Sequence, residues 1–183
     1  LPYGLLSPDI MAMDIFNDKL VIGGRAGLTY MDSSAFEYDE AIRDIAFDYS
    51  FITDIDASAN DLLIAGRGGV FRGSLTHRGW DRVISKKDLT SKRIYSIAAG
   101  SGGNLMVATE RNAFLFHESG LILRTLFPIG LDWPVFDIKY DAGQFYLSTY
   151  YGLYVYDEAT LGFTLKANSS GNTLPVSDDA AID

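Results

Sequence analysis

Residues 137–157 read DIKYDAGQFYLSTYYGLYVYD, and three other stretches follow the same pattern. They begin at Asp14 (DIFNDKLVIGGRAGLTYMD), at Asp54 (DIDASANDLLIAGRGGVFRG) and at Ser96 (SIAAGSGGNLMVATERNAFLFH). One anchor, an isoleucine in second place, recurs at steps of 40, 42 and 41 residues: Ile15, Ile55, Ile97 and Ile138. A second anchor, the small residue that ends the apolar run, recurs at steps of 42, 43 and 40: Gly24, Gly66, Thr109 and Thr149. Two anchors that agree on one period near 40 residues, in strand-rich repeats, are typical of a β-propeller.

Each repeat has the same internal order of strands and turns. A short apolar strand precedes a turn rich in Asn, Asp and Gly, which tolerate tight hairpins, and two more strands follow. A more polar outer strand is expected near residues 36–38, 80–84, 121–126 and 163–166, and residues 40–49 are expected to form a loop between blades. No segment carries a sustained helical period. The sequence predicts an all-β propeller of four-stranded antiparallel blades, at about residues 8–40, 50–85, 92–127 and 133–168.

The two ends of the chain resemble each other. SDDAAID from Ser177 parallels SPDIMAMD from Ser7, and both would lead into an innermost strand. We therefore expect residues 174–183 to start a further, partial blade, and the 183 residues to form one segment of a larger ring. The alternative is a closed ring of four blades with a loose tail. An open set of blades would expose sheet faces and favour oligomerisation, or completion by the remaining blades.

The fourth repeat resembles the two-component regulator propeller repeat. That pattern is a short apolar strand, a Gly-Thr or similar pair, two variable residues, Gly-Leu and an aromatic–Asp ending. The matching residues are Thr149, Gly152, Leu153, Tyr156 and Asp157. The first repeat follows the same pattern at Gly24, Gly27, Leu28, Tyr30 and Asp32. The resemblance implies an extracytoplasmic protein, periplasmic or at the cell surface, that acts as a glycan sensor or a surface propeller.

Composition narrows the classes of partner. Apolar residues make up 48% and charged residues 21% of the chain, which is typical of a globular protein. The net charge of −9 disfavours nucleic-acid binding, and no apolar stretch has the length that direct membrane insertion needs. The absence of cysteine excludes disulfides and thiolate metal sites. Residues 31–61 hold nine acids and one base, whereas residues 72–93 hold seven bases and two acids. The basic stretch is either a solvated rim or a contact for an acidic partner.

Candidate binding residues lie on the turns between second and third strands, which line one face of a propeller. The equivalent turn positions hold Arg25, Arg67, Glu110 and Tyr150, and the next positions include Arg111 and Tyr151. Arginines at this face could hold a carboxylate or a sulfate, and the tyrosines could stack on a sugar ring. The alternative is that Arg25 and Arg67 pair with acids of adjacent blades. Trp133, in the connection LDWPV, is either a further binding residue or a buried plug.

The sequence offers little for catalysis. Asp14, Asp54 and Asp137 recur once per blade and could form a ring of carboxylates, but a structural role as acceptors for a neighbouring blade's backbone is the simpler interpretation. His77 and His117 fall in different blades, opposite the candidate face. No nucleophile motif, metal-ligand cluster or phosphate loop is present, so no catalytic residue, metal or cofactor is expected.

These patterns favour a non-catalytic binding or sensor propeller that recognises a glycan or protein ligand at its channel face. One alternative is a structural or assembly module completed by a partner or by further blades. A lesser alternative is a glycan-active lyase or hydrolase, in which the recurring carboxylates would have to converge.

Overall fold

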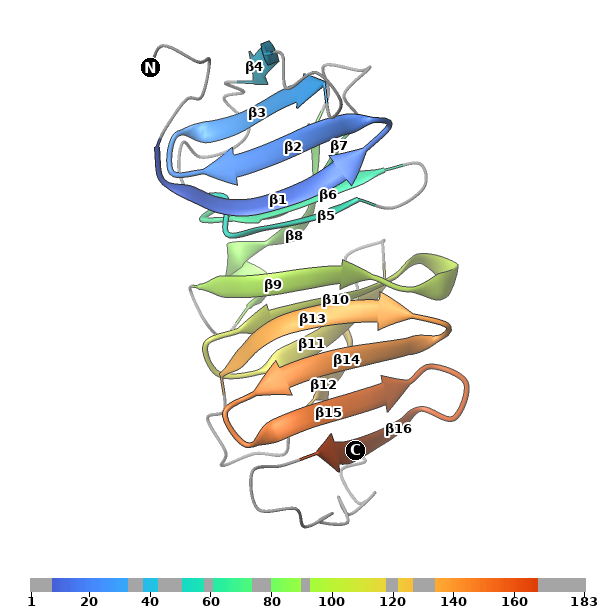
Figure 1. Ribbon diagram of the computed structural model, residues 1–183. Helices are drawn as coiled ribbons and strands as arrows, with labels where there is room; N and C mark the ends of the chain where they lie inside the picture. The colour runs from blue at the N-terminus through green and yellow to red at the C-terminus, as the bar shows by residue number, and fades with distance from the viewer. Residues whose placement is uncertain are drawn as a thin grey trace. The chain divides into compact units, whose positions relative to one another are not determined.

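A computed structural model describes residues 8–32, 38–42, 51–57, 61–73, 80–89, 93–117, 122–126 and 134–167 of the chain. These ranges form four antiparallel sheets of four strands, each with its strands in sequence order (Figure 1). Blade 1 comprises β1 (Ile10–Phe16), β2 (Lys19–Gly24), β3 (Gly27–Asp32) and β4 (Tyr38–Ile42). Blade 2 comprises β5 (Asp54–Ala57), β6 (Leu62–Gly66), β7 (Gly69–Gly73) and β8 (Trp80–Ser85). Blade 3 comprises β9 (Ile94–Ala99), β10 (Asn104–Thr109), β11 (Ala113–His117) and β12 (Ile122–Leu126). Blade 4 comprises β13 (Val135–Asp141), β14 (Gln144–Thr149), β15 (Gly152–Asp157) and β16 (Gly162–Ala167).

The prediction of an all-β propeller built from four-stranded antiparallel blades is confirmed. Short 3-10 turns at Lys86–Asp88 and Ser101–Gly103 are the only helical elements of the described ranges. The expected start of a further blade, residues 174–183, lies outside the described residues.

The outer strand of blade 1 differs from its predicted position. It was expected near residues 36–38, but β4 covers Tyr38–Ile42 and so includes part of the stretch predicted as a loop. Pairing with β3 explains the difference, because Ile42 at the end of β4 pairs with Leu28 near the start of β3. One extra residue lies between the partners of Tyr30 and Met31, and the outer strands of the other three blades have the same irregularity.

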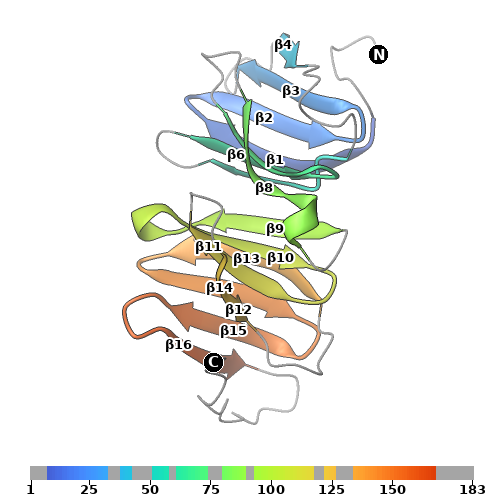
Figure 2. The same cartoon turned by 180° about the vertical axis from the view of Figure 1, so that it is seen from behind.

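The chain divides into two compact units, residues 1–94 and 95–183. In the N-terminal unit, blades 1 and 2 pack face to face (Figures 1 and 2). Blade 1 contributes Phe16, Val21, Leu28 and Tyr30, and the second blade with its lead-in contributes Ile52, Ile55, Leu62, Ile64, Phe71 and Trp80. Such a core forms because successive residues of each strand alternate between the two faces of its sheet.

In the C-terminal unit, blades 3 and 4 pack in the same way. Met106 and Leu115 of blade 3 share one core with Ile138, Phe145 and other apolar residues of blade 4. The isoleucine anchors of blades 2 and 4, Ile55 and Ile138, are therefore buried, at 2% and 0% exposure.

Polar contacts next to the isoleucine anchors connect neighbouring blades. Asp14 Oδ2 accepts a hydrogen bond of 2.9 Å from the backbone N–H of Ala57 in blade 2. In the C-terminal unit, Ser96 Oγ donates to Asp137 Oδ1 and accepts from the N–H of Ile138, both at 3.1 Å. The structural interpretation of the recurring aspartates is thus confirmed for Asp14, whereas Asp137 uses a side-chain donor instead.

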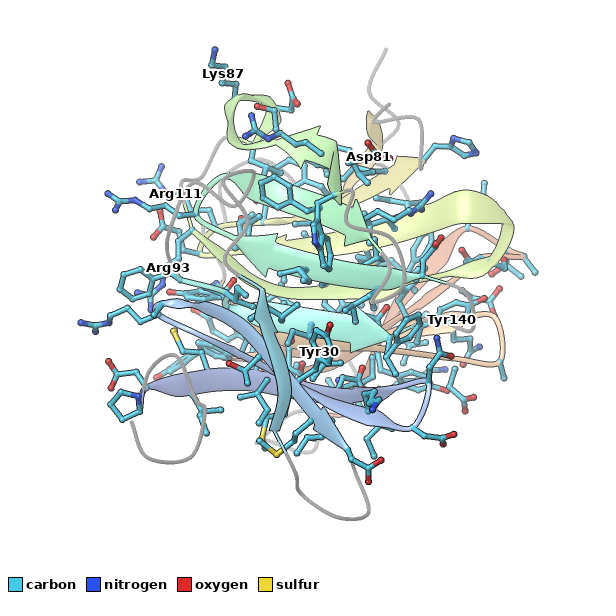
Figure 3. The ribbon with its side chains drawn as sticks, turned by 90° about the horizontal axis from the view of Figure 1, so that it is seen from above. Tyr30, Asp81, Lys87, Arg93, Arg111 and Tyr140 are labelled. Atoms are coloured by element: carbon cyan, nitrogen blue, oxygen red, sulfur yellow. The ribbon has the colours of Figure 1, made fainter. Side chains whose placement is uncertain are left out.

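Glu158 makes a second link between blades 3 and 4. Its carboxylate accepts hydrogen bonds from Ser101 Oγ at 2.5 Å, from Asn104 Nδ2 at 2.8 Å and from the hydroxyl of Tyr140 at 2.7 Å. Figure 3 labels Tyr140 at this end of the strands. Burial by itself raises the pKa of Glu158, but these hydrogen bonds outweigh it and hold the pKa below its usual value. Glu158 therefore stays ionised at neutral pH, and its hydrogen bonds link blade 3 to blade 4.

Asp157, which ends the repeat pattern, has a local structural role. The amide of Gln144 donates to it at 2.8 Å, and the N–H of Thr160 donates at 2.9 Å. These bonds lower the pKa of Asp157 to about 2. The side chain closes the turn between β15 and β16.

Candidate functional site

The candidate residues lie on hairpins whose backbone is tightly held. In the N-terminal unit, the segment leading into β5 passes beside the β2–β3 hairpin: the N–H of Phe51 donates to the carbonyl of Arg25 at 3.3 Å, and that of Ile52 donates to the carbonyl of Gly24 at 3.2 Å. The N–H of Thr53 then donates to the carbonyl of Ala65 at 2.9 Å. The lead-in segment is thereby fixed between the hairpins of blades 1 and 2.

The small residue that ends each second strand has a steric explanation. A Cβ at Gly24 would lie 2.4 Å from the carbonyl oxygen of Asp9, and one at Gly66 would lie 3.1 Å from that of Phe51. In the C-terminal unit a threonine takes this place and holds the hairpin by its side chain. Thr149 Oγ1 donates to the carbonyl of Gly152 at 2.9 Å and accepts from the N–H of Tyr151 at 3.2 Å.

A pocket of about 400 Å³ opens beside the β6–β7 hairpin. The described residues that line it are Phe51, Thr53, Gly66, Arg67, Arg93 and Ile94. Arg67 was predicted as a binding residue from its turn position. Arg93 is the last base of the basic stretch 72–93 and was not predicted as a binding residue. Figure 3 shows it at an edge of the N-terminal unit. Both side chains are exposed to solvent.

Arg25 lies next to this pocket and contacts one of its walls. Its guanidinium carbon is 4.9 Å from the centre of the Phe51 ring, and its Nε is 3.3 Å from Asp9 Oδ2. Asp9 immediately precedes β1, so Arg25 pairs with an acid of its own blade. The alternative prediction, a pairing with an adjacent blade, is wrong for this residue.

Two adjacent tyrosines project from the β14–β15 hairpin of the C-terminal unit. Tyr150 is 75% exposed and Tyr151 is 48% exposed. Their ring centres are 5.2 Å apart and their planes are inclined by 80°. Large aromatic rings lose little conformational entropy on binding, so an exposed pair on a fixed hairpin is suited to recognition.

The corresponding hairpin of blade 3 carries Glu110 and Arg111, and both residues are exposed. Arg111 is labelled in Figure 3. Thr109 holds this hairpin by accepting from the N–H groups of Arg111 and Asn112, at 3.3 and 3.0 Å. Trp133, the remaining predicted site residue, lies outside the described residues.

The described residues contain no group of three or more His, Asp or Glu side chains that could hold a metal ion. His117 pairs with Asn104 at the far end of its strand from the β10–β11 hairpin, and His77 is outside the described ranges. Within the same ranges there is no helix with the length and apolar character of a membrane span.

Comparison with known proteins finds similarity at the level of the fold. The extracellular domain assigned to a hybrid two-component system of B. thetaiotaomicron superimposes with a TM-score of 0.71 and 16% identity, over 90% of this chain and 23% of that chain. The WD40 repeats of RRP9 give 0.68 and 10% identity over 86% and 50% of the two chains. The computationally designed protein Ika4 gives 0.62 and 13% identity over 82% and 92%.

The chain thus spans about a quarter of the two-component domain that it resembles. No family model and no curated protein matches it. The structural neighbours confirm the propeller architecture and the resemblance to a two-component regulator propeller at the level of the fold.

Proposed function

We propose that the chain is a non-catalytic binding or sensor propeller that recognises a glycan or protein ligand with the hairpins that follow its second strands. The observation that carries the proposal is the exposed pair Tyr150 and Tyr151 on a hairpin held by Thr149. The extracellular placement of the similar two-component domain supports an extracytoplasmic location, periplasmic or at the cell surface. The proposed ligand-binding residues are Arg25, Arg67, Glu110, Arg111, Trp133, Tyr150 and Tyr151.

Exposure of both tyrosine rings has a physical consequence. Burying apolar ring surface under a ligand contributes free energy roughly in proportion to the area covered, about 25 cal/mol per Å². A sugar ring presents an apolar face of C–H groups, together with hydroxyls that can form hydrogen bonds with the tyrosine hydroxyls. The hairpin backbone is already ordered, so little entropy is lost when the ligand binds.

Replacing both Tyr150 and Tyr151 with alanine is expected to weaken ligand binding by about tenfold or more, as for aromatic hot spots of interfaces. Binding would be measured on a glycan array and then by titration with the best-bound glycan. The matched control is Leu161→Ala, which removes a 60%-exposed side chain from the β15–β16 hairpin of the same blade. Equal affinities of the double variant and the control would contradict the proposed site.

A second candidate function, an assembly module, is favoured by β1. Met13 and Ile15 of this strand are 60% and 61% exposed, and Met11 on the same face is 39% exposed. The equivalent isoleucines of blades 2 and 4, Ile55 and Ile138, are covered by the sheet packed against them. An apolar sheet face of this kind is suited to packing against another sheet, here that of a second copy.

The assembly function predicts that Ile15→Asp lowers the molar mass in solution, because it buries a charge in the interface. Sedimentation equilibrium of the wild type should give an oligomer, and the variant should give a monomer. Leu161→Asp is the control, since it places the same charge at an exposed position away from β1. A wild-type chain that stays monomeric as its concentration rises would refute association through this face.

A further inference from the structure

We infer that the pocket beside the β6–β7 hairpin, lined by Arg67 and Arg93, binds a carboxylate or sulfate group that is attached to a ring. The inference rests on the proposed binding function and names the chemical class of ligand for its N-terminal unit. Here Arg67 and Arg93 are the binding groups, and Arg25 lies behind the wall, where it contacts the ring of Phe51.

The charges of the pocket are of one sign. Two arginines line it, and none of its described lining residues is an acid. This is unusual in a chain whose net charge is −9. Two cations that line one hollow attract an anion more strongly than either does alone. Guanidinium groups offer a planar fork of donors that matches the oxygens of a carboxylate or a sulfate.

The volume and lining of the pocket indicate that the anionic group belongs to a larger ligand. A volume of about 400 Å³ exceeds that of a bare oxyanion and falls in the range of small-molecule sites. Phe51 and Ile94 supply an apolar wall beside the two cations. A ligand with an anionic group on a sugar or aromatic ring would use both parts of the pocket.

The backbone conformation of Phe51 is a second feature that indicates a binding site at this pocket. Its φ is 64°, in the left-handed region that a bulky side chain rarely adopts. Such a conformation costs about 1 to 3 kcal/mol and persists where the surroundings impose it, often at binding sites. Here the N–H bond to Arg25 and the Arg25 guanidinium over the ring hold Phe51 in position. Asp9 in turn pairs with that guanidinium and neutralises it.

The test uses benzoate and phenyl sulfate as probes, with benzyl alcohol as the uncharged analogue, titrated calorimetrically at constant ionic strength. The wild type is expected to bind the two anions and not the alcohol. Arg67→Gln and Arg93→Gln should each weaken anion binding by about tenfold or more, since hydrogen bonds to charged groups are the strong ones. Circular dichroism would establish that each variant is folded.

The matched control is Arg82→Gln, which removes an exposed arginine of the same unit that also stacks on a ring, that of Phe71 at 5.3 Å. This variant should bind both anions as the wild type does. Anion binding that is absent, or equal in the wild type and both pocket variants, would overturn the inference. A ligand that depends on Tyr150 and Tyr151 but not on Arg67 or Arg93 would also overturn it and leave the proposed function standing. Anion binding that depends on Arg67 and Arg93, with no glycan or protein ligand found, would support the pocket and count against the proposed function.

Discussion

Replacing Phe145 with alanine is expected to lower the free energy of unfolding by about 3 to 5 kcal/mol, which is the usual cost of emptying a large aromatic site. Phe145 is 0% exposed, and its ring centre lies 4.7 Å from that of Tyr140 and 6.4 Å from that of Tyr156. It reaches so far into blade 3 that a Cβ on Gly100 would lie 2.4 Å from its ring. The cavity would therefore open between two blades, where neither sheet can close it alone. Urea unfolding followed by circular dichroism would measure the loss.

Phe136→Ala is the control for Phe145→Ala. It removes the same side chain from the same blade, but Phe136 is 52% exposed and has a ring contact with Tyr95 at 6.4 Å. Its expected cost is within about 1 kcal/mol, as for most surface substitutions. Equal losses from the two variants would show that burial between the blades does not determine the effect.

Ile55→Ala is expected to destabilise the protein by about 2 to 5 kcal/mol, because a buried isoleucine is removed without a group to replace it. Ile55 is 2% exposed and packs in the core shared by blades 1 and 2. The blades meet at this strand, so the loss should also loosen the packing between them. Thermal unfolding followed by near-ultraviolet circular dichroism, which responds to aromatic packing, would measure both effects.

The equivalent substitution in blade 1, Ile15→Ala, is the internal control. Ile15 occupies the same repeat position but is 61% exposed. In the monomer its expected effect is within about 0.5 kcal/mol. A loss as large as that of Ile55→Ala, measured at a concentration where the chain is monomeric, would mean that the face of β1 is covered in solution.

The strands were predictable because their signals are local and repeated. Turn residues such as Asn17 and Gly143 adopt positive φ, as the tight hairpins of the prediction require. The outer strand of blade 1 was misplaced because its extent depends on its pairing with β3, in which Ile42 lies opposite Leu28. Such a pairing is a property of two strands together, and neither strand shows it in its own sequence.

The candidate site was predictable only in part. Arg67, Tyr150 and Tyr151 are candidates from the sequence because they occupy one equivalent turn position of the repeat and the one that follows it. Arg93 was missed, because it lies in a connection between blades that the repeat does not constrain. Glu158 was missed as well, since its partners Ser101 and Asn104 are more than 50 residues away in sequence.

The four isoleucine anchors show which properties of a residue follow from local sequence and which depend on tertiary packing. The sequence by itself determined that Ile15, Ile55, Ile97 and Ile138 each lie on an inner strand, because the alternation of side chains and the flanking turns are local properties. Only the tertiary structure decided that Ile55 and Ile138 are buried and that Ile15 is exposed. The physical reason is that burial depends on whether another sheet covers the face, and that sheet comes from residues distant in sequence.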